Sequence, residues 1–164
     1  MIANMYFQYL NSSKLWTTPF YSLDDFKNKP KIIICDIDGT LAIHNGRSPY
    51  DLSKVSEDLF NYNLWSVLEM VKNNVVFVSG REGTKQCRKD TLEWLSRYIQ
   101  IETPNLFMRE EGDNREDSII KKEIYETCIK PYYEVVAVFD DRDRVVDMWR
   151  SLGLFTCQVN YGGF

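Results

Sequence analysis

Five short apolar runs alternate with stretches of helical periodicity, and this alternation constrains the fold more than any other feature of the chain. The runs occupy 32–35, 75–78, 106–108, 135–139 and 155–159, and 106–108 is the weakest of them. Apolar runs without polar alternation are typical of strands buried on both faces, as in a parallel sheet. Because parallel strands need crossover connections, usually helices, the sequence predicts a doubly wound α/β fold with a mostly parallel, five-stranded sheet.

Four of the connecting stretches carry apolar residues at helical spacing. They are marked by Leu59, Leu64, Val67, Leu68 and Val71; by Thr91, Trp94, Leu95 and Tyr98; by Ile120, Ile124 and Cys128; and by Val145, Trp149 and Leu152. Gly153 follows the last stretch, at the position where glycine favours the end of a helix. We therefore expect four helices, the last of which ends at Gly153.

The N-terminal 30 residues differ in composition from the rest of the chain. They hold seven aromatic and only five charged side chains, whereas disordered tails are poor in aromatic residues. The whole chain of 164 residues has the usual length of one domain. We expect an aromatic-rich extension over 1–30, packed on the domain or on a partner, and one α/β domain over 31–164.

Charge, run length and cysteine spacing exclude several classes of protein. The net charge of -4 excludes a broad basic surface for nucleic acid, although it permits a small basic groove beside an acidic site. The apolar runs are far shorter than the roughly 20 residues of a membrane span, and we expect no signal peptide. The four cysteines form no CxxC or Cys/His cluster, which disfavours structural zinc and favours reduced thiols in the cytoplasm, with disulfides left open.

Polar residues follow the predicted strands where open α/β sheets bind their ligands, at the carboxyl ends of the strands. The first run precedes Asp36-Ile37-Asp38-Gly39-Thr40, the second precedes Ser79-Gly80-Arg81, and the fourth precedes Asp140-Asp141-Arg142. The helix after 106–108 carries Asp117 and Lys121, which are four residues apart and therefore on one face. We expect these groups to converge on one edge of the sheet.

Each of these motifs also has a structural explanation when taken alone. An Asp after a strand can be a turn residue or a helix cap, Ser-Gly can be a turn, and Asp117 can pair with Lys121 on a helix surface. Asp-x-Asp-Gly-Thr is more specific, since strand alternation puts Asp36 and Asp38 on one side and Gly39 permits a tight turn. The structural explanation would have to hold at all of these positions at once, which favours a functional site.

A cluster of three or four carboxylates needs a cation. Two carboxylates about 4 Å apart repel each other by roughly 1 kcal/mol in water and by about 4 kcal/mol at a protein surface. Oxygen ligands without His or Cys favour Mg²⁺, whose charge also lets a phosphate dianion enter an acidic pocket.

The order DIDGT, SGR, lysine and FDD resembles the haloacid-dehalogenase-like phosphatase superfamily. The resemblance implies that Asp36 attacks phosphorus and forms an aspartyl-phosphate, while Asp38 protonates the leaving alcohol and later activates water. It implies that Ser79 and Lys121 hold the phosphoryl oxygens. The implied ligands of Mg²⁺ are Asp36, the backbone carbonyl of Asp38, and one or both of Asp140 and Asp141.

A narrower resemblance covers residues 31–164. The segments DIDGTLA, NGRSPYDL, VVFVSGREGTK, REEGDNRED, KKEIYE and FDDRDRVVDMWR are similar to the 3′-phosphatase domain of phage-type polynucleotide kinase/phosphatase. This implies hydrolysis of 3′-phosphomonoesters at DNA or RNA ends, with Arg47 and Arg81 steering nucleic-acid phosphates and Asp117 supporting Lys121. Thr40 and Gly80 complete the implied substrate-binding set.

Two departures from that family accompany the resemblance. We expect no kinase half in this sequence, since GREGTK at 80–85 does not have the GxxxxGK[ST] spacing of a phosphate-binding loop. The stretch after Ser79 is also shorter than in the family. The implied partners are 3′-phosphorylated DNA or RNA ends and a separate 5′-kinase and ligase, without a membrane. The expected assembly is a monomer or a small homo-oligomer.

Alternative functions follow from the same residues. Short intervals between the motifs leave little room for a lid domain, which favours an open site that admits a polymer end. A phosphatase of small metabolites or phosphoproteins is the main alternative. A phosphorelay receiver domain would have its acidic pair after the first strand, and an inactive nucleic-acid-binding relic would not keep the full motif set. We expect His44, the single histidine, at the surface or near the substrate rather than in catalysis.

Overall fold

A fully parallel five-stranded sheet forms the centre of the protein. The computed structural model describes residues 29–71, 74–101 and 104–162. Its strands are β1 (Lys31–Cys35), β4 (Asn74–Glu82), β5 (Asn105–Arg109), β6 (Glu134–Arg142) and β7 (Thr156–Gly162), in the spatial order β5-β4-β1-β6-β7. Each neighbouring pair is parallel. All five predicted strands and the doubly wound α/β class are confirmed.

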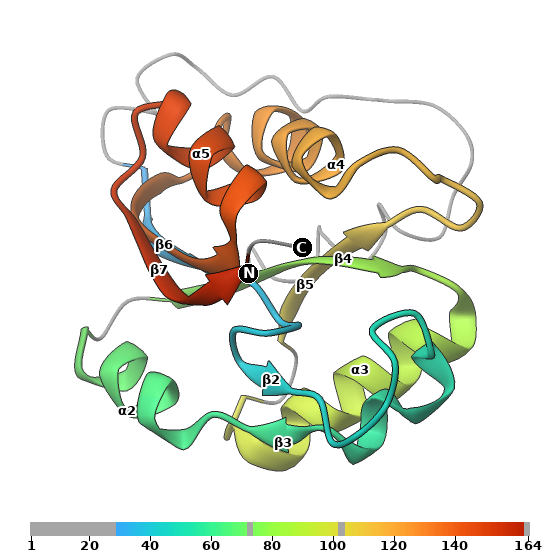
Figure 1. Ribbon diagram of the computed structural model, residues 1–164. Coiled ribbons are helices and arrows are strands. Elements are labelled where there is room, and N and C mark those ends of the chain that lie inside the picture. The colour runs from blue at the N-terminus through green and yellow to red at the C-terminus, as the bar shows by residue number, and fades with distance from the viewer. Residues whose placement is uncertain (1–28, 72–73, 102–103, 163–164) are drawn as a thin grey trace.

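Helices cover both faces of this sheet (Figure 1). The helices α2 (Tyr62–Val71) and α3 (Lys85–Tyr98) lie on one face, and α4 (Asp117–Ile124) and α5 (Asp143–Ser151) lie on the other. Because neighbouring side chains of a strand point to opposite faces, β1 sends Ile33 and Cys35 into one core and Ile32 and Ile34 into the other. This double burial is the reason that the strands are apolar without alternation.

Three of the four predicted helices occur where their periodicity indicates. Thr91, Trp94 and Leu95 are buried on α3, whose first turn is capped by the Thr84 side chain. The third prediction corresponds to α4 and the π-helical turn η3 (Tyr125–Ile129) that continues it. The fourth is α5, and Gly153 follows it with a φ of 79°.

The first predicted helix is partly wrong. Leu59 belongs to the short strand β3 (Leu59–Phe60), and α2 begins only at Tyr62 because the Asn61 side chain accepts a hydrogen bond from the backbone N–H of Leu64. A side chain that accepts from the first turn in this way fixes the start of a helix. Val67 lies on α2 but is 48% exposed, so the buried stripe of this helix is narrower than the sequence indicates.

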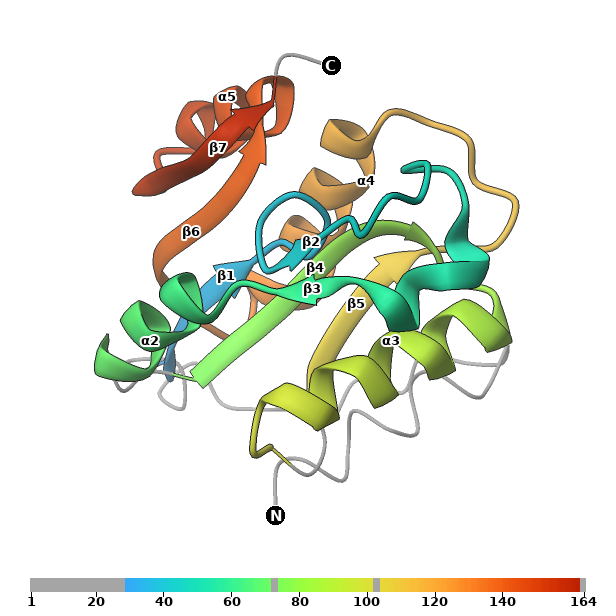
Figure 2. The same cartoon turned by 60° about the horizontal axis from the view of Figure 1, so that its bottom comes forward.

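A small insertion follows β1 in place of a lid domain. The strand β2 (Ala42–Ile43) pairs with β3 in an antiparallel hairpin, and the 3₁₀ helix η2 (Leu52–Glu57) lies between them. Figure 2 shows the hairpin and η2 above α3, near the end of β1. Within the described residues this agrees with the expected minimal cap.

Other expectations concern the cysteines, the membrane and the N-terminus. All four cysteines are free, so the disulfide alternative is not realised. Within the described ranges, no helix has both the length and the apolar character needed to cross a membrane. The extension expected over 1–30 falls almost wholly outside the described residues.

Replacement of Gly153 by Ala should lower the free energy of unfolding by about 1 kcal/mol. A Cβ at Gly153 would meet no neighbouring atom, so the cost comes only from the left-handed backbone that L-residues disfavour. Gly153→Asn should lose less, because Asn tolerates this conformation. Urea denaturation measures both variants, and an Ala variant as stable as the wild type would contradict the explanation.

Candidate active site

Three buried carboxylates meet at the carboxyl edge of the sheet. Asp36 follows β1, and its backbone N–H donates to the carbonyl of Phe139 at 2.9 Å, which holds it between β1 and β6. Asp36, Asp140 and Asp141 each offer one oxygen within 4.8 Å of the others. Gly39, with a φ of 81°, lies so close to Asp141 that a Cβ would overlap its carboxylate. The loop after β1 therefore needs glycine to reach this cluster.

The ammonium group of Lys121 lies inside the carboxylate cluster. Lys121 comes from α4, and its Nζ donates to Asp36 Oδ1 at 2.6 Å and to Asp140 Oδ2 at 2.8 Å. Its side chain is only 4% exposed. Burial alone would lower the pKa of Lys121, but the charges of Asp140 and Asp36 raise it above its ordinary value. The lysine is therefore a fixed positive charge at the site.

One ammonium does not balance three carboxylates. Burial raises the pKa of Asp36 well above its ordinary value against the opposing charge of Lys121, and the charges of Asp140 and Asp141 raise it further. Burial, followed by the charge of Asp140, also raises the pKa of Asp141 to about 6. A donor set of three carboxylates with excess negative charge fits a hard divalent cation. The structure thus brings together the side chains of the predicted metal site.

Asp38 has a different environment from Asp36. Its Oδ1 accepts from Arg47 Nη2 at 2.6 Å and from Arg81 Nη2 at 2.9 Å, and its Oδ2 accepts from Arg81 Nε at 2.7 Å. His44 Nε2 lies 3.0 Å from Oδ1. Burial would raise the pKa of Asp38, but the hydrogen bond from His44 and the two guanidinium groups hold it well below its ordinary value. The Asp38 side chain lies outside the carboxylate cluster, which leaves only its backbone for the predicted metal contact.

Arg47 and Arg81, which are expected to steer nucleic-acid phosphates, are enclosed among carboxylates in this structure. Their side chains are 2% and 1% exposed, and both bind the fully buried carboxylate of Asp58 as well as Asp38. Arg47 Nε donates to Asp58 Oδ1 at 2.6 Å, and Arg81 Nη2 donates to Asp58 Oδ2 at 2.8 Å. These enclosed donors hold Asp38 in place, and their steering of nucleic-acid phosphates stays a prediction.

Asp58 is a site residue that the sequence analysis missed. It lies between η2 and β3, where no apolar strand marks it, and its partners are 11 and 23 residues away. Its backbone carbonyl accepts from Trp94 Nε1 at 2.8 Å, so α3 also holds it. A buried carboxylate paired with two arginines is visible only once the hairpin and β4 are in place.

Ser79, Gly80 and Thr40 lie within the same site. Ser79 lies within β4 and is fully buried, and its hydroxyl accepts a hydrogen bond from the backbone N–H of Arg81 at 3.1 Å. Thr40 is also fully buried, with its Oγ1 3.5 Å from Asp141 Oδ1. A Cβ on Gly80 would be 2.8 Å from Asp117 Oδ1, so glycine allows Asp117 to pack against this turn.

Asp117 does not support Lys121 in the expected way. Its carboxylate accepts hydrogen bonds from Arg109 and Arg142, whereas Lys121 donates to Asp36 and Asp140. Arg109 comes from the end of β5, and its Nε also donates to the carbonyl of Gly80 at 2.8 Å. Asp117 therefore neither pairs with Lys121 on the helix surface nor contacts it within the site. Instead it bridges Arg109 and Arg142 at the edge of the site.

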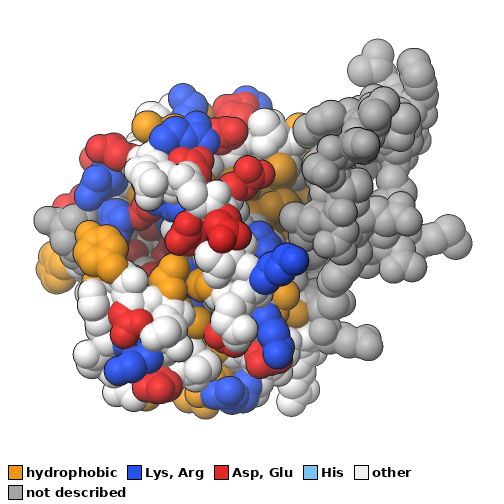
Figure 3. All heavy atoms as spheres, turned by 90° about the vertical axis from the view of Figure 1, so that its right-hand side faces the viewer, with side chains coloured by type: hydrophobic (Ala, Val, Ile, Leu, Met, Phe, Trp, Pro, Cys, Tyr) orange, Lys and Arg blue, Asp and Glu red, His pale blue; other side chains and the backbone are white. Residues whose placement is uncertain are grey.

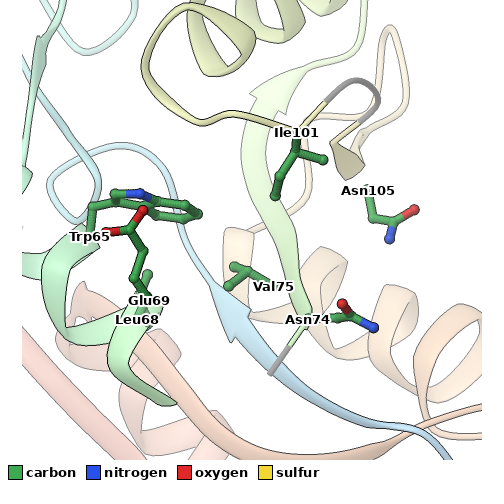
Figure 4. Close-up of a pocket in the computed structure, with 7 residues that line it drawn as sticks. All are labelled: Trp65, Leu68, Glu69, Asn74, Val75, Ile101 and Asn105. Atoms are coloured by element: carbon green, nitrogen blue, oxygen red, sulfur yellow. The ribbon is translucent and has the colours of Figure 1, made fainter. Parts of the chain in front are cut away.

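A cavity elsewhere in the molecule is not this site. It has a volume of about 210 Å³ and lies between α2 and the first residues of β4 and β5, where Trp65 and Leu68 face Val75 and Ile101 (Figure 4). Asn74 in its lining pairs with Ile32, near the start of β1, whereas Asp36 follows the end of that strand. The cavity therefore lies near the amino ends of the strands, whereas the carboxylate cluster lies at their carboxyl ends.

Comparisons with known proteins agree on one family. Residues 30–164 match the model of the polynucleotide kinase PNKP phosphatase domain. A protein of Autographa californica nuclear polyhedrosis virus, named as a bifunctional polynucleotide kinase/RNA ligase, is 35% identical over 132 residues, which are 77% of this chain and 19% of the relative.

Solved structures show the same likeness. One structure of the Pnkp1/Rnl/Hen1 RNA repair complex matches with a TM-score of 0.77 and 42% identity over 94% of this chain and 49% of the other. Another structure of the Pnkp1/Rnl/Hen1 complex has the same TM-score and 44% identity over 84% of this chain and 48% of the other. The class C acid phosphatase of Bacillus anthracis, with tungstate bound, shares the fold alone at a TM-score of 0.50 and 14% identity.

The chain spans about half the length of the Pnkp1 structures and a smaller share of the viral relative. The family model covers the whole of the α/β domain over 31–164, and the motifs at its strand ends occur in one site in the structure. The protein therefore belongs to the family of polynucleotide kinase phosphatase domains, with the haloacid-dehalogenase-like fold.

Proposed function

We propose that this protein is a polynucleotide 3′-phosphatase, which hydrolyses 3′-phosphomonoesters at DNA or RNA ends to 3′-hydroxyls through an aspartyl-phosphate. The observation that carries the proposal is the buried cluster of Asp36, Asp140 and Asp141, two of which bind Lys121, in a chain of this family. A nucleophile, a fixed cation and a hard metal site are the parts that phosphoryl transfer needs.

Asp36 is the proposed nucleophile. Because burial favours its neutral form, the hydrogen bond from Lys121 helps to keep it anionic and fixes the direction of its free oxygen. Mg²⁺, held by Asp36, the backbone carbonyl of Asp38 and one or both of Asp140 and Asp141, would supply positive charge against the carboxylates and the phosphate. Ser79 and Lys121 hold the phosphoryl oxygens during the transfer.

Asp38 is the proposed general acid and base. It protonates the leaving 3′-oxygen in the first step and accepts a proton from water in the second. Its guanidinium partners favour the carboxylate, which is the form that activates water. A phosphate dianion beside Asp38 raises its pKa again, since like charges disfavour the anion, and so permits the acid role.

A polymer end is the proposed substrate class. The small β2–β3 hairpin leaves the described site without a lid domain, which suits a strand that continues past the reacting phosphate. Positive and negative side chains are interspersed on the face shown in Figure 3, so no broad basic patch covers that face. The family supports this class over the small-metabolite alternative.

The proposed partners follow from the chemistry of end repair. A 3′-hydroxyl is the product of this reaction and a substrate of strand joining, so we place a separate 5′-kinase and ligase beside it. The matched structures contain Pnkp1 in a complex with Rnl and Hen1, and the viral relative combines kinase and ligase in its name. We also propose that 1–30 is an extension of the catalytic domain over 31–164, in a cytoplasmic protein.

Asp36→Asn should abolish turnover of a 3′-phosphorylated oligonucleotide while the protein stays folded. An amide keeps the shape of the side chain but cannot act as the anionic nucleophile. Phosphate release measures the activity, and a thermal melt measures the fold. Asp147→Asn, an exposed change on α5, is the matched control and should retain full activity.

The substrate class is tested by steady-state kinetics on three phosphomonoesters: a 3′-phosphorylated oligonucleotide, its 5′-phosphorylated isomer and a free sugar phosphate. We expect the 3′ isomer to have the highest kcat/KM by at least about tenfold, which is 1.4 kcal/mol of transition-state stabilisation. A tenfold preference for either competitor would contradict the polynucleotide-end assignment and favour the small-molecule alternative.

Arg81→Ala should reduce turnover of an oligonucleotide and of a small aryl phosphate by similar factors. The change leaves Asp38 and the buried Asp58 to share one guanidinium, that of Arg47, so the free energy of unfolding should also fall, by about 3–5 kcal/mol. The exposed Arg150→Ala on α5 is the control. A loss confined to the oligonucleotide would instead indicate direct contact between Arg81 and the nucleic-acid backbone.

A further inference from the structure

His44 is a partner of Asp38 in the inserted hairpin region, and it has no role in the proposed mechanism. It follows directly after β2, and its Nε2 lies 3.0 Å from Asp38 Oδ1. The two side chains are 23% and 27% exposed, whereas the arginines that bind Asp38 are almost fully enclosed. His44 therefore contacts Asp38 from the side that is open to solvent.

We propose that His44 is a positioning residue for Asp38, and this inference rests on the proposed phosphatase function. Its Nε2–H donates to Asp38 Oδ1 and turns the carboxylate so that Oδ2 faces the reacting ester. The direction of donation follows from the acceptor, because a carboxylate has no hydrogen to give.

The distribution of donors over the two carboxylate oxygens supports this assignment. Oδ1 accepts from Arg47, Arg81 and His44, whereas within the described residues Oδ2 accepts only from Arg81 Nε. A carboxylate oxygen has two acceptor positions. Oδ1 is therefore saturated, and Oδ2 keeps a position at which a proton can pass to the leaving oxygen or from water.

The other contacts of the two arginines distinguish them from His44. Arg47 and Arg81 also bind Asp58, so their places are set by a buried ion network whether or not Asp38 is correctly turned. The contact of His44 with Asp38 comes from the end of β2 instead. His44 thus links the position of the hairpin to the orientation of the proposed general acid.

The hydrogen bond and the packing of the ring can be separated by two variants. His44→Gln keeps an N–H donor at a similar reach, whereas His44→Phe keeps a ring without a donor. The loss of a hydrogen bond to a charged acceptor corresponds to a decrease in rate of about 10- to 100-fold. We expect the Phe variant to lose this factor in kcat on a 3′-phosphorylated oligonucleotide, with KM changed little, and the Gln variant to recover most of it.

The dependence of the activity loss on the leaving group distinguishes a positioning role of His44 from a merely structural one. An activated aryl phosphate needs little protonation as it leaves, so His44→Phe should be impaired much less on this ester than on the oligonucleotide. The exposed neighbour Asn45→Ala is the control on both substrates. Equal losses on both esters, or a Phe variant more active than the Gln variant, would overturn the positioning role.

The same panel separates this inference from the proposed function. A simple alkyl phosphate is included, since it also needs a protonated leaving group but carries no nucleic acid. If the wild type hydrolyses the alkyl and aryl esters but not the oligonucleotide, the polynucleotide assignment fails and the His44 comparison is made between alkyl and aryl esters. If the wild type hydrolyses none of them, both are overturned.

Discussion

The contact of the Lys121 ammonium with Asp36 and Asp140 is the interaction on which the site depends. Three carboxylates enclosed at one sheet edge repel each other and lose hydration, and one lysine offsets part of that cost. The contact also fixes the fold around it, because it ties α4 to the ends of β1 and β6. The remaining negative charge is what makes the edge a site for a hard cation.

A second buried network, around Asp58, gives the other half of the site the opposite character. Arg47 and Arg81 join Asp58 to Asp38, so Asp38 is surrounded by positive charge, whereas Asp36 is buried beside two further carboxylates and one ammonium. Burial, together with the charges of Asp140 and Asp141, raises the pKa of Asp36, while the hydrogen bond from His44 and the two guanidinium groups lower the pKa of Asp38, although only one residue separates them. The two carboxylates of one motif therefore lie in opposed electrostatic environments.

The hairpin that follows β1 contributes to both networks. The Asn61 amide donates to the carbonyl of Thr40 at 3.0 Å. His44 contacts Asp38 directly, and Asp58 is linked to Asp38 through Arg47. A segment that is too small to form a lid therefore still shapes the site. The proposed substrate, a polymer end, suits this arrangement because a small insertion arranges Asp38 without enclosing the substrate.

The sequence by itself determined the strands, three of the four helices and the residues that follow the strand ends. Asp36, Asp38, Ser79, Asp140 and Asp141 could be placed together because parallel strands end at one edge, and Lys121 because helical spacing put it on the helix after β5. Only the tertiary structure decided which charges pair. The roles of Asp58, Arg47, Arg81 and Asp117, and the contact of His44 with Asp38, depend on side chains that meet across separate elements. Local periodicity does not predict such contacts, because the pairing of buried charges depends on the distances between side chains in the packed structure.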